Sequence, residues 1–409
     1  MTILSALGFK KTDLRVLLLF SVLTFVGLAD SQIISPILPE LAADFDRHVT
    51  EANRVVTFYF AGAALASLIA GPLLDSRGRK VTLLMGACIA GLGDGAIALT
   101  SSFVLLLLCR FLAGLGVSLA AVAMTTYIGD YFAYKVRAKA LAFVTIGFFS
   151  GYTFGIPLAG YLADTFGWRA ALLTFALVIG TIFLCCLVGI PRLGGPRSPL
   201  RVRTFVQTVV ALHSSSQPAQ AMLVYACIGA STIAFMAYVG DWLYRTLNFS
   251  IADRSQIFFW CGLATLVVIP ISGLWADRYG KRAPSIVGST IIATFLLVVP
   301  FLHSNPLLIY PTFMVLAAGM GLRQSPLLAL VTEIITSEKR GTFIALKNAW
   351  TQIGAALGNF IAGILYYHAG YTAVVYFSSG LIFFTAILIL LYIREPGSTR
   401  NQRHGTSES

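Results

Sequence analysis

Two versions of one charged turn lie 202 residues apart in this chain of 409, namely Gly71-Pro72-Leu73-Leu74-Asp75-Ser76-Arg77-Gly78-Arg79-Lys80 and Gly273-Leu274-Trp275-Ala276-Asp277-Arg278-Tyr279-Gly280-Lys281-Arg282. In each version a glycine ends an apolar run, an aspartate follows four residues later, and then come a second glycine and two cations. Each also lies between apolar segments long enough to cross a lipid bilayer. A charged turn repeated between such segments indicates two copies of one membrane-embedded half.

The composition is that of a membrane protein. Hydrophobic residues make up 57% of the chain and charged residues 11%. Soluble domains carry roughly 25% charged residues, so this chain has too few to cover a water-facing surface. Three stretches, 170–191, 255–276 and 371–393, hold no charged residue over the length of a bilayer span. The composition therefore predicts an all-α membrane protein.

Apolar runs separated by short polar turns predict twelve transmembrane helices, six in each half. We place them near 14–37, 53–74, 81–99, 103–128, 139–163, 169–190, 219–243, 255–275, 283–302, 307–333, 343–367 and 372–393. The long break between the halves carries prolines and arginines, and a short interfacial helix is expected in it at 205–212. The predicted organisation is a first half at 1–190, a linker at 191–218, a second half at 219–394 and a polar tail at 395–409.

The positive charge is unevenly placed along the chain, whose net charge is +12. If the turns alternate between the two sides, 22 of the 29 Lys and Arg residues lie on one side and five on the other. The remaining two, Arg110 and Arg323, lie inside apolar runs. This distribution follows the positive-inside rule and predicts that both termini are cytoplasmic. Topology thus explains the excess charge, and nucleic acid is not expected as a partner.

Asp30 and Arg110 are charged residues within predicted spans. Asp30 lies about seven residues before the outer end of the first span, and Arg110 about seven residues into the fourth from the same side. At 1.5 Å per residue both lie roughly 10–12 Å below that surface, which allows an ion pair. A charged and unpaired carboxylate at this depth costs several kcal/mol. The pair either takes up a proton or holds two helices together, and for Asp94, in the third span, we expect a structural role.

The repeated turn has the form G-x-L-x-D-x-x-G-R-K, which resembles the loop signature between helices 2 and 3 of the major facilitator superfamily. In the first copy the signature is met by Gly71, Leu73, Asp75, Gly78, Arg79 and Lys80. The second copy, with Asp277 and Gly280, is similar to the duplication in that family. Arg110, followed by Gly114 and Gly116, resembles a helix-4 motif of the same family. The resemblance covers nearly the whole chain and is strongest to the twelve-helix drug/proton antiporters.

The resemblance implies a transporter that works by alternating access, in which Asp30 and Arg110 couple transport to protons. It also implies a conformational latch at the repeated turn, in which Asp75 meets the start of helix 11 in the outward-open state. A tight loop with positive-inside charges is the alternative for this turn. In helix 5 the family's antiporter motif is matched by Gly151, Gly155, Pro157 and Gly160, with the proline displaced by one position and an alanine in place of a glycine.

Aromatic and hydrogen-bonding side chains of the predicted spans are candidates for the wall of a substrate cavity: Phe25, Tyr59, Tyr152, Tyr238, Arg323, Asn348, Trp350 and Gln352. Arg323 has no counterpart in the first half. It either binds an anionic group of the substrate, pairs with Glu333, or is a packing arginine whose stem covers apolar surface. A cavity with few charges and many aromatics suits small amphipathic molecules.

These observations together predict a proton-coupled exporter of small amphipathic, drug-like or metabolite substrates. We expect a monomer in the inner membrane of a bacterium, with protons and membrane lipids as partners and with no cofactor or metal. The alternatives are an uptake or facilitative carrier for a small organic solute and, from another class, a membrane enzyme. The enzyme is disfavoured because the five histidines are scattered in loops or near helix ends and no HExxH motif is present.

Overall fold

The computed structural model describes residues 11–193, 202–304, 306–336, 339–393 and 395, and these residues form helices and turns without a strand. The N-terminal half consists of α2 (Lys11–Gln32), α3 (Ile34–Asp44), α4 (Val49–Ala52), α5 (Arg54–Arg77), α6 (Arg79–Ile97), α7 (Phe103–Tyr131), α8 (Tyr134–Ser150), the π-helical turn η1 (Gly151–Gly155), α9 (Ile156–Phe166) and α10 (Trp168–Gly189). The linker contains α11 (Val202–Ser214). The C-terminal half consists of α12 (Ser216–Leu247), α13 (Ile251–Tyr279), α14 (Arg282–Val298), the 3₁₀ turns η2 (Val299–Ser304) and η3 (Pro306–Leu308), α15 (Ile309–Glu333) and α16 (Arg340–Leu391).

Within the described ranges, eleven helical segments are long and apolar enough to cross a membrane. One of them, α16, has 52 residues, and a straight helix of that length would span about 78 Å, more than twice the hydrocarbon core. The segment turns back at Gly370, whose φ of 72° lies in the left-handed region that glycine adopts without strain. Its two arms therefore cross separately, which gives the twelve spans expected from the sequence.

Two helix boundaries differ from the sequence prediction. The first span bends after α2 and continues through α3 to Asp44, beyond the predicted end near residue 37. The bend places Pro36 in the first turn of α3, where a missing N–H is tolerated. The short helix expected at 205–212 is present as the longer α11.

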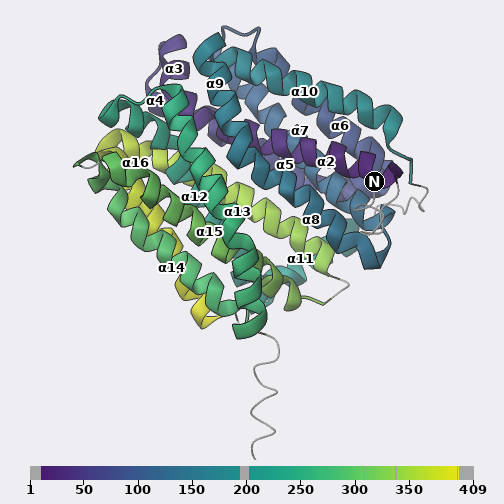
Figure 1. Cartoon of the computed structure of the whole chain (residues 1–409). Helices are drawn as coiled ribbons and strands as arrows, with labels where there is room; N and C mark the ends of the chain where they lie inside the picture. Colours follow the sequence, from purple (N-terminus) through teal and green to yellow (C-terminus); the bar gives the residue numbers. More distant parts are fainter. Residues whose placement is uncertain (1–10, 194–201, 305, 337–338, 394, 396–409) are drawn as a thin grey trace, which may run out of the picture.

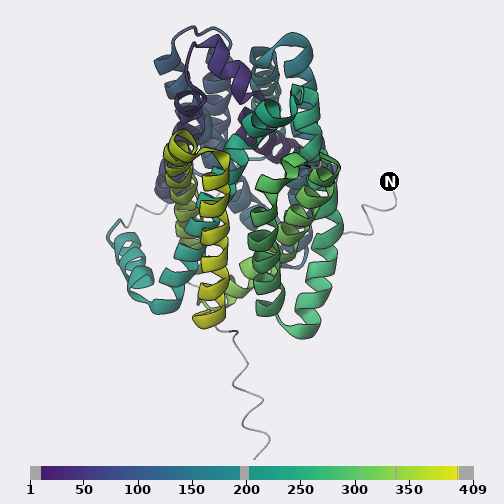
Figure 2. The ribbon, with the colours of Figure 1, turned by 90° about the vertical axis from the view of Figure 1, so that its left-hand side faces the viewer.

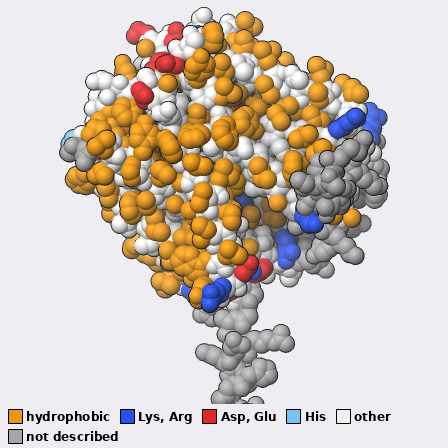
Figure 3. All heavy atoms as spheres, in the orientation of Figure 1, with side chains coloured by type: hydrophobic (Ala, Val, Ile, Leu, Met, Phe, Trp, Pro, Cys, Tyr) orange, Lys and Arg blue, Asp and Glu red, His pale blue; other side chains and the backbone are white. Residues whose placement is uncertain are grey.

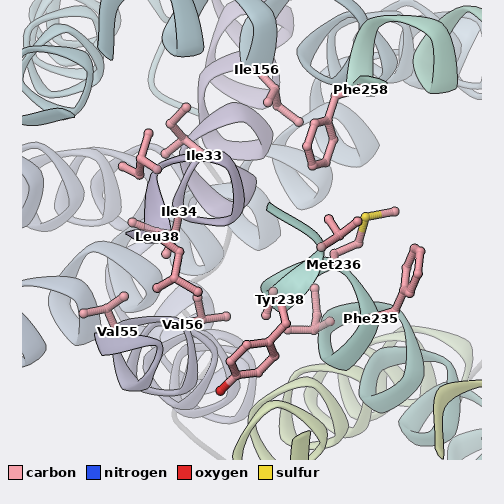
Figure 4. Packing of buried hydrophobic residues seen from close by; sticks show 14 of the residues in the cluster. Ile33, Ile34, Leu38, Val55, Val56, Ile156, Phe235, Met236, Tyr238 and Phe258 are labelled. Carbon is pink, nitrogen blue, oxygen red and sulfur yellow. The ribbon is translucent and has the colours of Figure 1, made fainter. Parts of the chain in front are cut away.

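The two ends of the bundle differ in how the halves meet. The side that carries α11 and the turns at 77–80 and 279–282 is called the basic end. The opposite side, with the turns near Asn53, Gly167 and Gly370, is called the far end. At the far end one apolar cluster includes both halves. Figure 4 shows Ile33, Ile34 and Leu38 of the N-terminal half facing Phe235, Met236 and Tyr238 of the C-terminal half. At the basic end each half has an apolar cluster of its own, one around Phe20 and Tyr127 and the other around Leu330 and Phe343.

Polar contacts join the halves at the far end as well. Asn53 donates to the Asn359 side chain at 2.9 Å, and Ser35 donates to the backbone carbonyl of Met236. Arg254 of α13 forms an ion pair with Glu40 of α3. The halves are thus sealed together at this end.

The halves separate toward the basic end. In Figure 1 the purple-to-blue bundle and the green-to-yellow bundle converge at the upper left and diverge toward the lower right, and Figure 2 shows α11, in teal, at one side of the molecule. In Figure 3 the surface is hollowed between the two bundles, and Lys and Arg side chains gather around the hollow. The structure is therefore closed at the far end and open at the basic end.

Candidate functional site

A cluster of charged side chains is buried inside the N-terminal half. Nη1 of Arg110 on α7 lies 2.6 Å from Oδ1 of Asp30 on α2 and 3.3 Å from Oδ1 of Asp94 on α6. Nη2 of Arg110 also donates to the backbone carbonyl of Asp30 at 3.2 Å. The guanidinium lies over the ring of Tyr59 on α5, 4.6 Å from its centroid. We call Asp30, Tyr59, Asp94 and Arg110 the N-half charge cluster.

Close packing of helices brings the cluster together. A Cβ atom on Gly93 would lie 2.8 Å from the backbone nitrogen of Ala113, so α6 approaches α7 closely at this level. Asp94, the next residue, therefore lies against the helix that carries Arg110. Small residues at helix crossings are the usual means of such close approach in membranes.

The cluster does not balance its charges. The side chains of Asp30 and Asp94 are 0% exposed and that of Arg110 is 1% exposed. Two carboxylates and one guanidinium leave one excess negative charge when all three are ionised, which is costly in a buried site. One carboxylate oxygen of each aspartate, Oδ2, has no hydrogen-bond partner. A single proton on either carboxylate would make the cluster neutral.

The sequence predicted part of this cluster. Asp30 and Arg110 are in contact, as their equal depth suggested, and Tyr59 is buried beneath the arginine rather than exposed on a cavity wall. Asp94, for which we expect a structural role, faces the same guanidinium as Asp30. The signal for this placement in the sequence is Gly93, the small residue next to Asp94, at which α6 approaches α7.

The aromatic cavity candidates occupy different surroundings. Tyr238 is fully buried at the far end, where its ring stacks on Tyr366 with 4.5 Å between centroids. Phe25 and Tyr152 are half-buried, the former on α2 and the latter in the π-helical turn η1. Trp350 donates from Nε1 to Nε2 of His213 at 3.1 Å, so its indole lies against the linker helix α11.

The polar cavity candidates lie in the C-terminal half. Arg323 on α15 is 5% exposed, and its Nη1 atom has no hydrogen-bond partner. It does not pair with Glu333, because that carboxylate is bound by Lys281. Asn348 and Gln352 are half-buried, one turn apart on the first arm of α16.

The two copies of the repeated turn make matching contacts. Gly78 and Gly280 end α5 and α13 with φ values of 85° and 87°, which favour glycine. Arg79 donates to Asp130 at the end of α7, and Lys281 pairs with Glu333 at the end of α15.

The second cation of each copy binds backbone carbonyls at the end of the last helix of its half. Lys80 donates to Ile190 at 2.6 Å and to Leu187 at 2.8 Å. Arg282 donates to Ile389 at 3.2 Å and also to Leu390. The turn therefore links three helices within each half.

The aspartates of the two turns make no such contacts. Asp75 and Asp277 are exposed, and neither forms an ion pair with another described residue. Of the residues expected to act as a latch, Arg79 and Lys80 hold the helices of their own half together here, and Gly78 and Gly280 end the helices before the two turns. Gly71, Asp75 and Asp277 make no such contact. A contact between Asp75 and the start of the eleventh span does not occur in this conformation, which is open at the basic end.

The residues of the helix-5 motif lie at two close helix contacts. A Cβ atom on Gly155 would lie 2.8 Å from Cβ of Ala29, the neighbour of Asp30, and one on Gly151 would lie 2.7 Å from the carbonyl of Phe25. A Cβ atom on Gly160 would lie 1.9 Å from Oγ of Ser255, which belongs to the other half. Pro157 follows the π-helical turn at the start of α9, and such turns are frequent at functional sites.

Comparisons with known proteins agree with this arrangement. The family model described as Major Facilitator Superfamily matches residues 20–239 and 221–408. The cis,cis-muconate transport protein of Acinetobacter baylyi is 23% identical, over 86% of this chain and 87% of that protein. The multidrug resistance protein MdtG of Klebsiella pneumoniae is 24% identical, over 86% of each chain.

The fold is also similar to a solved structure. The crystal structure of a D-xylose-proton symporter superimposes with a TM-score of 0.78, and the alignment covers 93% of this chain and 98% of the other. Because the two sequences are only 15% identical, this likeness concerns the fold alone.

Proposed function

This chain belongs to the major facilitator superfamily and is an integral membrane transporter rather than an enzyme, and we propose that it is a proton-coupled carrier of small organic molecules that works by alternating access. The observation that carries the proposal is the N-half charge cluster. The cluster consists of two buried carboxylates that share one arginine. It is charged without a proton and neutral with one, so its free energy depends on protonation.

A chain of contacts connects this site with the interface between the two halves. Asp30 follows Ala29, which lies against Gly155 in the helix-5 motif, and the same motif contacts the other half at Gly160. A change of charge at Asp30 can therefore alter the packing between the halves. The charged and titratable groups that surround Asp30 are Asp94, Arg110 and Tyr59.

The membrane topology determines to which side of the membrane the present conformation is open. We place the basic end in the cytoplasm of a bacterium, with both termini on that side, because cytoplasmic turns carry the excess of Lys and Arg. The structure would then be the inward-open state of the carrier. In the outward-open state the basic end closes, and Asp75 would reach the positive N-terminal end of the eleventh span.

Export in exchange for protons is the direction that we propose first. It is supported by the helix-5 motif at 151–160 and by the similarity to a multidrug resistance protein. We expect the protein to act as a monomer, with Phe25, Tyr152, Asn348 and Gln352 near the substrate. Lipids of the surrounding membrane are its other partners.

Proton-linked uptake is the second candidate. The similarity to a protein named for transport of cis,cis-muconate supports a small organic acid as the substrate in this case. Uptake of an anion together with protons would also reduce the electrical cost of moving negative charge into a cell.

Proton movement in everted, energised membrane vesicles tests the proposal. Cationic, neutral and anionic compounds are added one at a time, and the internal pH is followed for the wild type and for Asp30→Asn. We expect a substrate to release protons from wild-type vesicles, and we expect at least a tenfold smaller response from the variant. Proton entry together with uptake of the compound into vesicles that are not energised would identify symport instead.

Asp164→Asn is the matched control, because this aspartate is exposed on α9 in the same half. It makes the same chemical change without touching the cluster and should respond like the wild type. If Asp30→Asn still moves protons with its substrate, Asp30 is not the coupling group. Saturable transport without any proton movement in the wild type would show a facilitative carrier and refute proton coupling.

A further inference from the structure

Two cations of the C-terminal half, Lys347 and Arg323, form no ion pair with any described acid. Nζ of Lys347 on α16 lies over the ring of Tyr225 on α12, 4.4 Å from its centroid. Tyr225 also packs against the apolar cluster that includes Leu327 of α15, one turn after Arg323. Arg323 is 95% buried, since its exposed fraction is 5%, and its Nη1 atom lacks a hydrogen-bond partner. We call these three residues the C-half basic cluster.

The three residues lie at a similar depth below the basic end. Lys347 is seven residues after the start of α16, Tyr225 is nine after the start of α12, and Arg323 is ten before the end of α15. A rise of 1.5 Å per residue therefore places them roughly 10–15 Å from that end. Helices α12 and α16 are also the ones that contact α3 and α5 of the other half at the far end. Toward the basic end they border the space that opens between the halves.

Every described acid of the C-terminal half is engaged elsewhere or exposed. Asp241 binds Arg245 and Tyr366, Asp253 caps α13, and Glu333 binds Lys281. Asp277 is exposed at the basic end, and Glu395 accepts from the backbone of Lys281. The C-half basic cluster thus has two cations whose charge no described carboxylate offsets. Charged groups at this depth are costly unless they have a partner or face water.

We infer that the C-half basic cluster is a binding site for the anionic group of a small organic acid, reached from the basic end. Arg323 offers an N–H group with a free hydrogen-bonding position, and Lys347 offers a mobile ammonium, so together they complement a carboxylate. Tyr225 holds the ammonium and supplies an aromatic face beside it. This inference rests on the proposed carrier function and names its substrate class. It holds for either direction of transport.

Equilibrium binding to the full chain in nanodiscs of phosphatidylcholine tests the inference. These discs contain no anionic lipid that could occupy the site. The probes are benzoate, adipate and inorganic phosphate, with benzamide as the neutral analogue of benzoate and benzylammonium as the cationic one. We expect benzoate or adipate to bind at least tenfold more tightly than benzamide and benzylammonium. We also expect Lys347→Gln and Arg323→Gln each to weaken carboxylate binding at least tenfold, while Lys347→Arg retains most of it.

Arg278→Gln is the matched control, since it removes one exposed cation from the same half and should leave binding unchanged. Tighter binding of phosphate than of both carboxylates, an equal response to benzamide, or no carboxylate binding up to tens of millimolar would each overturn the inference. The binding assay separates the inference from the proton-coupling proposal, because no proton gradient is present. Carboxylate binding that is weakened in Lys347→Gln and Arg323→Gln would support the inference even if Asp30→Asn leaves proton movement in the vesicles unchanged.

Discussion

The two halves of the molecule share one framework and differ in their buried charges. In both, a glycine with a positive φ angle ends the helix before the repeated turn. The first cation of the turn then forms an ion pair, and the second binds backbone carbonyls at the end of the last helix of the half. Inside the N-terminal half, however, one arginine lies between two carboxylates. Inside the C-terminal half, Lys347 lies over Tyr225 and Arg323 is buried at a similar depth, and no described carboxylate pairs with either cation.

This difference suggests a division of work between the halves. A buried cluster with more carboxylates than cations can bind a proton, whereas a buried cluster with more cations than carboxylates can bind an anion. The contacts of the repeated turn hold each half together, and different residues at a few buried positions determine what each half binds. Substitutions at matched residues of the two halves test whether their buried charges act differently.

The largest effect is expected from removing the two buried arginines in turn. Arg110→Gln leaves two buried carboxylates without their partner, and breaking a buried ion pair typically costs about 3–5 kcal/mol. Arg323→Gln leaves no carboxylate unpaired, so the free energy of unfolding should fall little or even rise. Thermal unfolding of the purified variants in detergent measures both. Equal destabilisation by the two substitutions would show that the charge environments of the halves do not differ as described.

An intermediate effect is expected at the contact between the halves. Gly160→Val would place side-chain atoms into Ser255 at the far end, where an added Cβ would lie 1.9 Å from Oγ. The closed far end should become less stable and the basic end should close more often. Labelling of Lys347→Cys by a bulky polar maleimide should then slow severalfold. Gly180→Val is the control, because no atom lies within 4 Å of a Cβ built at Gly180. Unchanged labelling in Gly160→Val would show that the halves do not move against each other at this contact.

The smallest effect is expected at the matching ion pairs of the repeated turn. Arg79 with Asp130 and Lys281 with Glu333 are partly exposed pairs, and such pairs contribute about 0.2–1 kcal/mol. Double-mutant cycles on thermal stability should give similar small coupling energies for the two pairs. A coupling energy well above this range in one half alone would mean that the two frameworks are not equivalent.

Much of the fold could be predicted from the sequence because hydrophobic length and charged turns dominate helix placement in a bilayer. The twelve spans, the linker helix and the tight turns at Gly78 and Gly280 all follow from those signals. The continuation of the first span to Asp44 could not be predicted, because the prolines at 36 and 39 indicate the end of a helix. The bend at Ile33 restarts the helix and makes Pro36 acceptable in its first turn, whereas Pro39 lies inside α3.

The buried sites were less predictable because a sequence gives the depth of a residue but not the helix face on which it lies. Depth alone paired Asp30 with Arg110. Asp94 needed the close approach of α6 to α7 to be placed beside them. The position of Lys347 in the sequence places it with the cations of the basic end, although it lies two turns inside α16. Only the contact with Tyr225 distinguishes it from those surface cations.

The contacts of Lys80 also bear on how the protein is made. This lysine binds the last carbonyls of α10, at Leu187 and Ile190, so the N-terminal half completes its own packing with residues that precede the linker. A chain synthesised from its N-terminus can therefore finish one stable half in the membrane before α12 leaves the ribosome. A chain cut within the linker should accordingly yield two fragments that insert separately and reassemble at the far end.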